Sequence, residues 1–277
     1  MSNTTQNTAQ AWTPEDVLSL VVQPLERESL ATRLSQFQTG LTGDALRVPL
    51  VTDDPSAQWV NEGEEIPLSD ASLGETDARY RKLAGLTVVS RELAEDSHPS
   101  AVEEIGKGLV RDIARKLDAA MFSDAGAKAP SGLATLDGVT ELTAPAKWAN
   151  LDVFKQAKLR AAALGTSVAA FVVNTEDAAA LLVLKETSAS NKDLIESDGT
   201  SFTIGGTPVL PSEDVAAGTA WAVPAGRIVV GVRQNTSVDV DHSAFFTSDR
   251  VAIRATMRVA FAFTHPKAVT KIVQASA

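Results

Sequence analysis

Residues 82–122 read KLAGLTVVSRELAEDSHPSAVEEIGKGLVRDIARKLDAAMF, and they join a predicted strand to a long predicted helix. The strand, Arg79–Arg91, alternates in polarity and becomes β-branched toward its end. From Pro99 to Phe122, apolar residues recur every three or four positions, which predicts one amphipathic helix. These residues are Val102, Ile105, Leu109, Ile113, Leu117 and Met121. At ~1.5 Å per residue the helix is roughly 36 Å long, so it can be the spine of a domain.

The segment before this stretch predicts a long β-hairpin. Residues 46–52 form its first strand, and Pro49 favours an edge position because proline cannot donate a ladder hydrogen bond. A second extended piece, Ala57–Leu68, leads to a polar tip over Ser69–Ala78 with Gly74 as its turn residue. The strand described above then returns. A ribbon of this length is not stable alone in water, so it must lie on its own domain or on a neighbouring copy.

The N-terminus is predicted to begin with a polar, flexible tail over residues 1–11. Thr13 then caps a short helix, since a hydroxyl at this position accepts from a free backbone N–H of the first turn. Pro24 interrupts that helix, and a second helical piece covers Glu26–Phe37 before Gly40 ends it.

Downstream of the spine helix, the sequence predicts a linker and then an αβα unit. Residues Gly126–Pro145 are rich in Gly, Pro and Thr, which is typical of a junction between two domains. The unit consists of a helix at Leu151–Leu164, a buried strand at Ala170–Asn174 and a helix at Glu176–Lys185. Gly165 is expected to end the first helix, and Thr175 is expected to cap the second.

The last third of the sequence predicts mainly strands. Residues 187–201 are polar and are expected to form a mobile loop. Short strands follow at Phe202–Ile204, Thr207–Pro211, Ala220–Val223 and Arg227–Arg233. From Ser237 onward we expect two long antiparallel strands joined by a loop near His242–Asp249, and then a final strand at about Ala268–Val273. The fold class is therefore α+β, without repeats.

Composition excludes several classes of protein. The 277 residues are 44% apolar, which is ample for a buried core, and contain no cysteine, which excludes disulfides and thiolate chemistry. No apolar run reaches the ~18 residues of a membrane span, and the first residues do not resemble a signal peptide, so we expect neither a membrane segment nor targeting. A net charge of −10 disfavours phosphate binding over the whole surface.

The charges are unevenly distributed along the chain. Between Val48 and Ala78 there is no lysine or arginine, while from Arg250 to the end there is no acid. The acids of the first segment are Asp53, Asp54, Glu62, Glu64, Glu65, Asp70, Glu75 and Asp77. The bases of the second are Arg250, Arg254, Arg258, Lys267 and Lys271. Either the two segments are separate solvated faces, or they meet within one subunit or between subunits.

No constellation of residues predicts catalysis, a cofactor site or a metal site. His98, His242 and His265 are far apart and lack the spacing of metal ligands. Phosphate loops, nucleophile elbows and dinucleotide fingerprints do not occur in the sequence. Gly205-Gly206 leads into a proline and a strand rather than a helix, so we interpret it as a tight turn. The aromatic residues are few and not interleaved with bases, which argues against a nucleic-acid stacking surface.

Four segments, in order, resemble the major capsid proteins of tailed bacteriophages with the HK97 fold. They are residues 57–70 (AQWVNEGEEIPLSD), 82–97 (KLAGLTVVSRELAEDS), 204–212 (IGGTPVLPS) and 230–233 (VGVR). The first resembles the opening of the family's long E-loop, and the second resembles the strand that leads into its spine helix. Each segment is short, but their shared order covers about residues 40–270.

The resemblance implies an architecture for the whole chain. It implies an N-terminal arm, an E-loop hairpin, a peripheral (P) domain with the spine helix and long antiparallel strands, and an axial (A) domain. The implied ranges are 1–40 for the arm, 41–96 for the E-loop hairpin, 97–129 for the spine helix, 130–228 for the A-domain, 229–264 for the long strands of the P-domain, and 265–277 for a strand returning to the A-domain.

The resemblance also implies a function. The protein would be a structural, non-enzymatic subunit that self-assembles as pentamers and hexamers into an icosahedral shell around double-stranded DNA. It would reside in the virion, be assembled in the cytoplasm of a bacterial host, and work with a portal and possibly a decoration protein. DNA would be enclosed without sequence-specific binding. Because only about a dozen polar residues precede the first predicted helix, we expect a separate scaffolding protein or none.

The expected contacts between subunits follow from the charge pattern and the E-loop. We expect Trp59, Glu62, Glu64 and Glu65 of one subunit to meet Arg250, Arg254 and Arg258 of the next. Some capsids of this family carry covalent Lys–Asn crosslinks at the E-loop. This hairpin tip contains no lysine, since Lys82 lies in the returning strand, so we expect no crosslinks.

Two other functions fit parts of the sequence. The first is an encapsulin-type nanocompartment shell, which has the same fold but encloses cargo enzymes, although no encapsulin-like N-terminal segment is evident. The second, from a different class, is a soluble α+β enzyme or binding domain, which would require a defined pocket.

Overall fold

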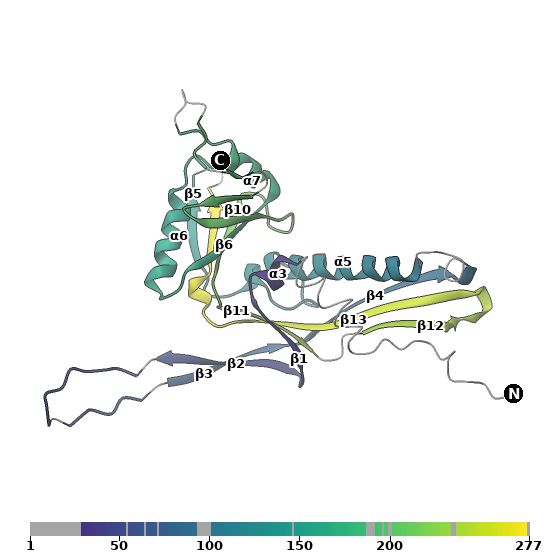
Figure 1. Cartoon of the computed structure of the whole chain (residues 1–277), viewed down its shortest axis with the longest axis horizontal. Coiled ribbons are helices and arrows are strands. Elements are labelled where there is room, and N and C mark those ends of the chain that lie inside the picture. The colour runs from purple at the N-terminus through teal and green to yellow at the C-terminus, as the bar shows by residue number, and fades with distance from the viewer. Residues whose placement is uncertain are drawn as a thin grey trace.

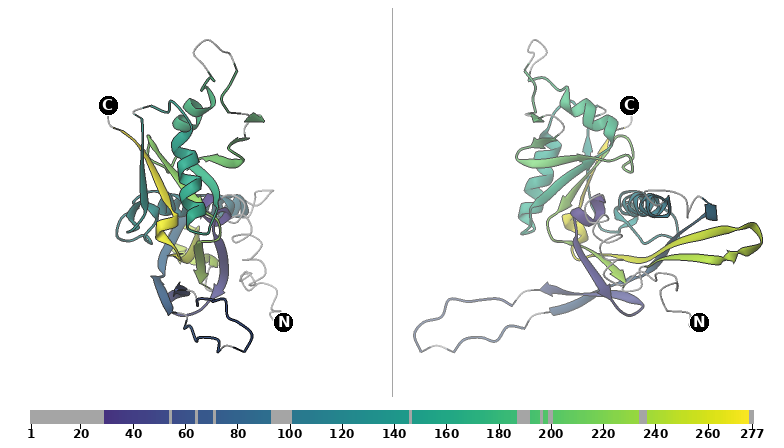
Figure 2. Two further views of the ribbon diagram at one scale, coloured as in Figure 1. Left: turned by 90° about the vertical axis from the view of Figure 1, so that its left-hand side faces the viewer. Right: turned by 45° about the vertical axis from the view of Figure 1, so that its right-hand side comes forward.

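The computed structural model describes residues 29–53, 55–63, 65–70, 72–92, 101–145, 147–186, 192–195, 197–198, 201–233 and 237–275. Two sheets and one projecting hairpin make up this part of the chain (Figure 1). One sheet lies along a long helix, the other carries two shorter helices, and the hairpin extends away from both (Figure 2). The predicted α+β class is confirmed.

The first sheet is built around one long central strand. Strand β13, Arg250–Phe263, pairs antiparallel with β4 along one side and with β12 and then β11 along the other, while β1 pairs parallel with β11. The bounds of the other strands are Gln36–Leu41 for β1, Arg81–Ser90 for β4, Ile228–Arg233 for β11 and Ser237–Phe245 for β12. The two long antiparallel strands predicted after Ser237 are thereby confirmed, but β12 continues through the first half of the predicted loop, to Phe245.

The predicted spine helix is α5, Ala101–Phe122, and it packs on this sheet. Its apolar stripe packs against alternate residues of β13: Ile105 and Leu109 are half-buried, while Leu117 and Met121 are buried in the core that contains Ile253 and Met257. Burial of a side chain of this size contributes about 1.5–3 kcal/mol, so the stripe accounts for much of the attachment of helix to sheet. No helix in the described ranges is long and apolar enough to cross a membrane.

The second sheet carries the predicted αβα unit. Its strand order among the described residues is β5-β14-β10-β6-β9-β8-β7. The bounds are Thr140–Ala144 (β5), Val168–Val173 (β6), Ser197–Asp198 (β7), Ser201–Ile204 (β8), Thr207–Pro211 (β9), Thr219–Pro224 (β10) and Thr270–Gln274 (β14). Helices α6, Asp152–Ala163, and α7, Thr175–Leu182, complete a separate core in which Phe154 and Phe171 meet edge to face at 5.1 Å between ring centroids.

Two local predictions in this unit can be compared with the structure. Gly165 follows α6 with φ +66°, as a helix-terminating glycine should. The prediction that Thr175 caps α7 is wrong, because the cap is Asn174, whose side chain accepts from the backbone N–H of Glu176 at 2.9 Å. Thr175 is instead the first residue of the helix.

The prediction that Gly126–Pro145 is only a linker is wrong. It contains a short 3-10 helix, η2, at Leu133–Thr135 and strand β5, which lies parallel to β14 at the C-terminal end of the described chain. Strand β5 forms because it pairs with β14, about 130 residues later in the sequence. The residues around Thr140 do not by themselves indicate a strand, because nothing near them in the sequence shows that partner.

The prediction of a helix over Glu26–Phe37 is mostly wrong. Within the described residues only Leu30–Arg33, α3, is helical, and Gln36–Leu41 forms β1 beside β11. This parallel pairing is again non-local and overrides the weak helical pattern. The predicted tail and the helix at Thr13 lie outside the described residues.

The hairpin consists of β2, Ala45–Asp53, and β3, Ser72–Arg79, paired antiparallel with each other alone. The edge position predicted from Pro49 is confirmed. The predicted tip at Ser69–Ala78 is wrong, since most of it is β3 and Gly74 lies opposite Leu50 in the ladder. The turn lies instead at Glu62-Gly63, where Gly63 has φ +83°, in a span without strand pairing that includes the predicted extended piece Ala57–Leu68.

The return strand predicted at Arg79–Arg91 also has a different partner. The strand is present as β4, but it pairs with β13 and not with the first strand of the hairpin. Its inward residues, Leu83 and Val89, belong to the core beneath α5. Burial of that face outweighs continuation of the solvated ribbon, so the chain leaves the hairpin at Tyr80 and enters the sheet.

Candidate assembly surface

The hairpin is anchored at its base and free at its tip. Leu46 and Val48 of β2 and Tyr80 pack with Val229 and Ala260 of the sheet in a small separate cluster. Beyond this cluster β2 and β3 extend away from the body, and Figures 1 and 2 show the span between them as the outermost part of the chain. The tip is thus held by contacts within the hairpin, such as the hydrogen bond from the backbone N–H of Ser56 to Oγ of Ser69 at 2.8 Å, and projects away from the body.

Large apolar side chains are exposed along this projection. Trp59 and Leu68 are fully exposed, and Ile66 and Leu73 are exposed over about three quarters of their surface. A single exposed leucine is ordinary in a folded protein, but a tryptophan and three aliphatic residues exposed on one projecting ribbon are an unusual concentration of apolar surface. Such surfaces mark sites of protein association.

The same tip is acidic. Glu62, Glu65 and Asp70 are exposed there, whereas Glu64 lies outside the described residues. Near the base of the hairpin Arg47 reaches Asp77 with 3.4 Å between Nε and Oδ1, so only the strands close to the body bring a cation to this ribbon. The tip thus combines exposed apolar groups with a net negative charge.

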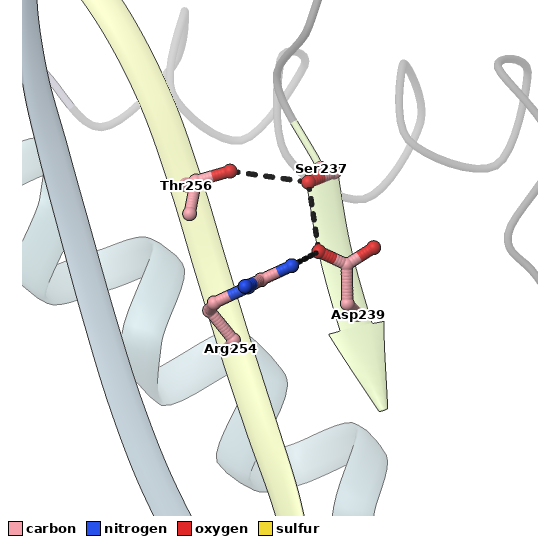
Figure 3. A network of polar contacts seen from close by, with 4 residues as sticks. All are labelled: Ser237, Asp239, Arg254 and Thr256. Carbon is pink, nitrogen blue, oxygen red and sulfur yellow. Dashed lines mark hydrogen bonds and ion pairs between the residues drawn. The ribbon is translucent and has the colours of Figure 1, made fainter. Parts of the chain in front are cut away.

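Of the arginines predicted to receive this tip, Arg254 has a partner within its own chain. Its guanidinium donates to Oδ2 of Asp239 on the neighbouring strand β12 at 2.8 Å (Figure 3). The same carboxylate oxygen accepts from Oγ of Ser237 at 3.1 Å, and that hydroxyl lies 3.1 Å from Oγ1 of Thr256. The network joins β12 to β13 and neutralises Arg254 on the exposed face of the sheet.

The other two predicted arginines differ from each other. Arg250 donates from Nε to Oγ of Ser248 at 2.9 Å, and its guanidinium lies 5.3 Å from the ring centroid of Phe245. Arg258 is half-buried, lies opposite Lys82 in the register of β13 with β4, and has no ion pair with any described residue. Arg250 and Arg258 thus have no ion pair with a described residue, whereas Arg254 does.

The hairpin tip and these arginines do not meet within one chain. The tip lies at one end of the molecule, and the end of β12 and β13 that carries Arg250 lies at the other (Figures 1 and 2). A contact between the tip and these arginines could therefore form only between two copies.

The described ranges lack the side-chain clusters typical of a metal site. They contain no group of three or more His, Asp or Glu side chains placed to hold a metal ion. One hollow of about 510 Å³ lies at the base of the hairpin and is open to solvent. Its charged lining residues are Asp77, Arg79 and Arg81, and Asp77 is already paired with Arg47.

Known proteins share both the sequence pattern and the fold of this chain. The sequence matches the model of the phage capsid family over residues 10–274. The chain belongs to the phage capsid family. It is accordingly a structural, non-enzymatic protein of a capsid shell and a component of the phage particle, and its shell is built from many copies.

Individual relatives are distant in sequence and similar in fold. The major capsid protein of Staphylococcus phage 80alpha is 24% identical, in an alignment that covers 92% of this chain and 82% of the relative. A solved structure from Mycobacterium phage Adephagia has a TM-score of 0.70 with 17% identity and covers 90% of this chain and 91% of its own. The capsid of a native GTA particle, computed with C5 symmetry, has a TM-score of 0.66 with 17% identity and covers 100% and 94%.

These findings confirm the HK97 fold expected for this phage capsid protein from its four sequence segments. They also set aside the enzyme or binding domain considered as an alternative. Sequence reasoning missed one set of residues at the surface, the four cations that surround a groove beside α5. Lys116 belongs to α5, and Arg81, Lys82 and Lys128 come from other segments. Only the fold brings the four together.

Proposed function

We propose that this capsid protein is the main building block of the icosahedral head of a tailed double-stranded DNA phage, and that it assembles as pentamers and hexamers. The observation that carries the proposal is the projecting hairpin, whose fully exposed Trp59 and Leu68 have no support from their own chain. A two-stranded ribbon is marginal in water, and laying it on a neighbour buries its apolar side chains. Contacts of this head-to-tail kind close into rings and shells when their rotation closes.

The proposed domain division follows the two sheets. The P-domain comprises α5 with the sheet around β13, and the A-domain comprises the second sheet with α6 and α7. Three features of the chain support this division: the arm and hairpin precede α5, the short segment between Pro224 and Ile228 passes from the second sheet to the first, and β14 returns to the second sheet beside β5. The proposed ranges remain 1–40, 41–96, 97–129, 130–228, 229–264 and 265–277.

The proposed partners are those of a DNA-filled head. The shell encloses double-stranded DNA without reading its sequence, and assembly takes place in the cytoplasm of a bacterial host with a portal, a separate scaffolding protein and, in some heads, a decoration protein. The net charge of −10 supports the statement on DNA, because a wall that neutralised many phosphates would hold the packaged DNA tightly.

The proposed subunit contact places Trp59, Glu62, Glu64 and Glu65 of one copy on the body of the next. Arg250, Arg254 and Arg258 are candidate partners there. Arg254 already binds Asp239, so a second carboxylate would have to share its guanidinium, which offers five N–H donors. Exposed ion pairs contribute about 0.2–1 kcal/mol each, so these pairs would set register more than affinity.

Truncation of Trp59 tests the proposal. Purified wild-type chain is expected to form shells, capsomers or sheets in negative-stain micrographs. For Trp59→Ala we expect the concentration needed for assembly to rise at least about 10-fold, since a buried tryptophan at an interface commonly contributes about 2 kcal/mol or more. Trp59→Phe keeps an aromatic anchor and should assemble at a concentration within a few-fold of wild type. Small discrete wild-type particles at all concentrations would contradict the proposed function.

The absence of lysine between Val48 and Ala78 makes a second prediction. Assembled particles boiled in detergent should release a single band near 29.1 kDa, because the hairpin tip carries no amine for an isopeptide bond. The measurement is a denaturing gel of purified particles, with unassembled protein as the reference lane. A ladder of multiples of the subunit mass would show that a lysine elsewhere, such as Lys82, forms covalent links.

A further inference from the structure

Strand β14 lies inside the second sheet, between β10 and β5, although it follows every other described strand in the sequence (Figure 1). It pairs antiparallel with β10 over Thr219–Ala222 and parallel with β5 over the whole length of both strands. Strand β5 has no other strand partner among the described residues. Without β14 the sheet would therefore end at β10, and β5 would have no strand to pair with.

One face of β14 is part of the core of this sheet. Thr270 is 1% exposed and Ile272 is 0% exposed. The side chain of Ile272 belongs to the same buried cluster as Leu142 of β5 and Phe154 of α6. If β14 were absent, this core would be open to water, and the backbone groups along one side of β10 would have no partners.

The first sheet and the hairpin do not need this strand. Strand β13, the last strand of the first sheet, ends at Phe263, and β14 pairs with no strand of that sheet or of the hairpin. No residue of β14 is among the described members of the core beneath α5. The long helix, the first sheet and the projecting hairpin can thus form while the second sheet is still incomplete.

The connection to β14 is fixed at its start. The backbone N–H and Oγ1 of Thr264 both donate to the carbonyl oxygen of Arg227, at 3.0 and 3.1 Å. The short 3-10 helix η4, Pro266–Ala268, then leads to β14. Residues 264–274 are called the C-terminal strap below. Because its start is anchored, the strap is held close to the space between β5 and β10 of its own chain, which gives its insertion a high effective concentration.

We propose that the C-terminal strap closes the second sheet last, and that only a subunit with β14 in place is added to a shell. The inference rests on the proposed function, in which the second sheet is the axial domain of the subunit. An unclosed sheet would present β10 as an open edge, and an open edge is a template for pairing with other chains. Closure by β14 therefore separates ordered assembly from aggregation through that edge.

Thiol accessibility tests the strap, because the chain has no cysteine and each variant below carries a single one. Ile272→Cys and Ile253→Cys replace two isoleucines that are both 0% exposed, the first in β14 and the second in the first sheet. In the unassembled chain we expect a bulky maleimide to label Ile272→Cys at least about 10-fold faster, because local opening of the strap exposes only this thiol. An equal or slower rate would show that β14 does not open separately and would overturn the inference.

Entry into shells is the second readout. A bulky group on residue 272 prevents β14 from packing, so the labelled share of Ile272→Cys in purified shells should be at least about 10-fold below its share in the unassembled pool. Mass spectrometry of the intact protein measures both shares. Thr143→Cys, at an exposed position on β5, is the control, and its labelled form should enter shells in full proportion. If labelled Ile272→Cys enters shells as readily, the inference fails and the proposed function stands. If the wild type forms no shells or capsomers, both fail.

Hydrogen exchange of the wild type measures the strap without any substitution. In the unassembled chain we expect the backbone amides of β14 and β5 to exchange at least about 10-fold faster than those at the centre of β13, and in purified shells this difference should shrink. The two strands should change together, because β14 is the one described strand that pairs with β5. Amides of β14 as well protected as those of β13 before assembly would contradict the inference.

Discussion

Replacement of Gly132 by alanine is expected to prevent stable folding. The added Cβ would lie 1.9 Å from the carbonyl oxygen of Ala120 and 2.6 Å from that of Met121, both in the last turn of α5. These are backbone atoms of a buried helix end, so they cannot move aside as the end of a flexible side chain can. We expect a loss of about 3 kcal/mol or more in the free energy of unfolding, which exceeds ordinary overpacking.

Urea unfolding of the unassembled chain, followed by fluorescence of its four tryptophans, measures this loss. Gly106→Ala is the matched control, because Gly106 lies within α5 and its Cβ would meet nothing within 4 Å. Alanine there should raise stability by about 0.5–1 kcal/mol through its helix propensity. A Gly132→Ala protein as stable as the wild type would mean that the segment after α5 can lift from the helix end without cost.

The parts of the fold that were predictable are those with a strong local period. The stripe of α5 specified both the helix and its buried face, since residues three and four apart must share one side. Strand β13 shows period two between Ile253 and Val259, with Arg254 exposed between buried Ile253 and Ala255. In such elements the same residues that set the local conformation also make the core.

The elements that were missed depend on distant partners. Strands β1 and β5 pair parallel with β11 and β14, and neither contains an apolar pattern strong enough to mark a strand by itself. The predicted tip of the hairpin, Ser69–Ala78, lies further along the sequence than the actual turn for a related reason. Gly74 resembles a turn residue, but β3 pairs across it, and the actual turn uses Gly63 where a positive φ is needed.

Charge could be predicted as a pattern but not as a set of partners. The acidic hairpin tip was evident from the run between Val48 and Ala78, and its exposure agrees with that pattern. The partner of Arg254 was not evident, because Asp239 becomes its neighbour only through the register of β12 with β13. The hydrogen bonds of Asp118 could not be predicted for the same reason, because their donors, Ser29, Leu30 and Ala31, are distant in the sequence. On a helical wheel Asp118 is one more polar residue of α5.

Asp118→Ala is expected to detach the segment that enters the body ahead of β1. The carboxylate of Asp118 is only 8% exposed and accepts from Oγ of Ser29 at 2.5 Å and from the backbone N–H groups of Leu30 and Ala31 at 3.0 and 2.9 Å. It thus binds the N-terminal end of α3 to the spine helix. Alanine leaves these donors buried without an acceptor, so we expect a loss of about 2–4 kcal/mol in the free energy of unfolding.

Asp118→Asn separates the role of the charge from the role of the shape. Burial raises the pKa of Asp118 above its ordinary value of 3.8, against the opposing effects of the Ser29 hydrogen bond and of Arg33. The folded chain therefore takes up this proton at a higher pH than the unfolded chain. As the pH falls from neutral toward 3.8, the wild type should gain stability relative to Asp118→Asn, whose side chain does not titrate.

Burial likewise raises the pKa of the nearby Asp214, and the charge of Asp118 adds to that shift, so part of the pH effect should also appear in Asp214→Asn. Urea midpoints of wild type, Asp118→Asn and Asp214→Asn between pH 4 and 7 measure the pH dependence of stability. Hydrogen exchange of residues 29–41 measures the detachment of the segment that Asp118 holds. Parallel pH profiles of wild type and Asp118→Asn would show that the carboxylate of Asp118 is not buried in this way.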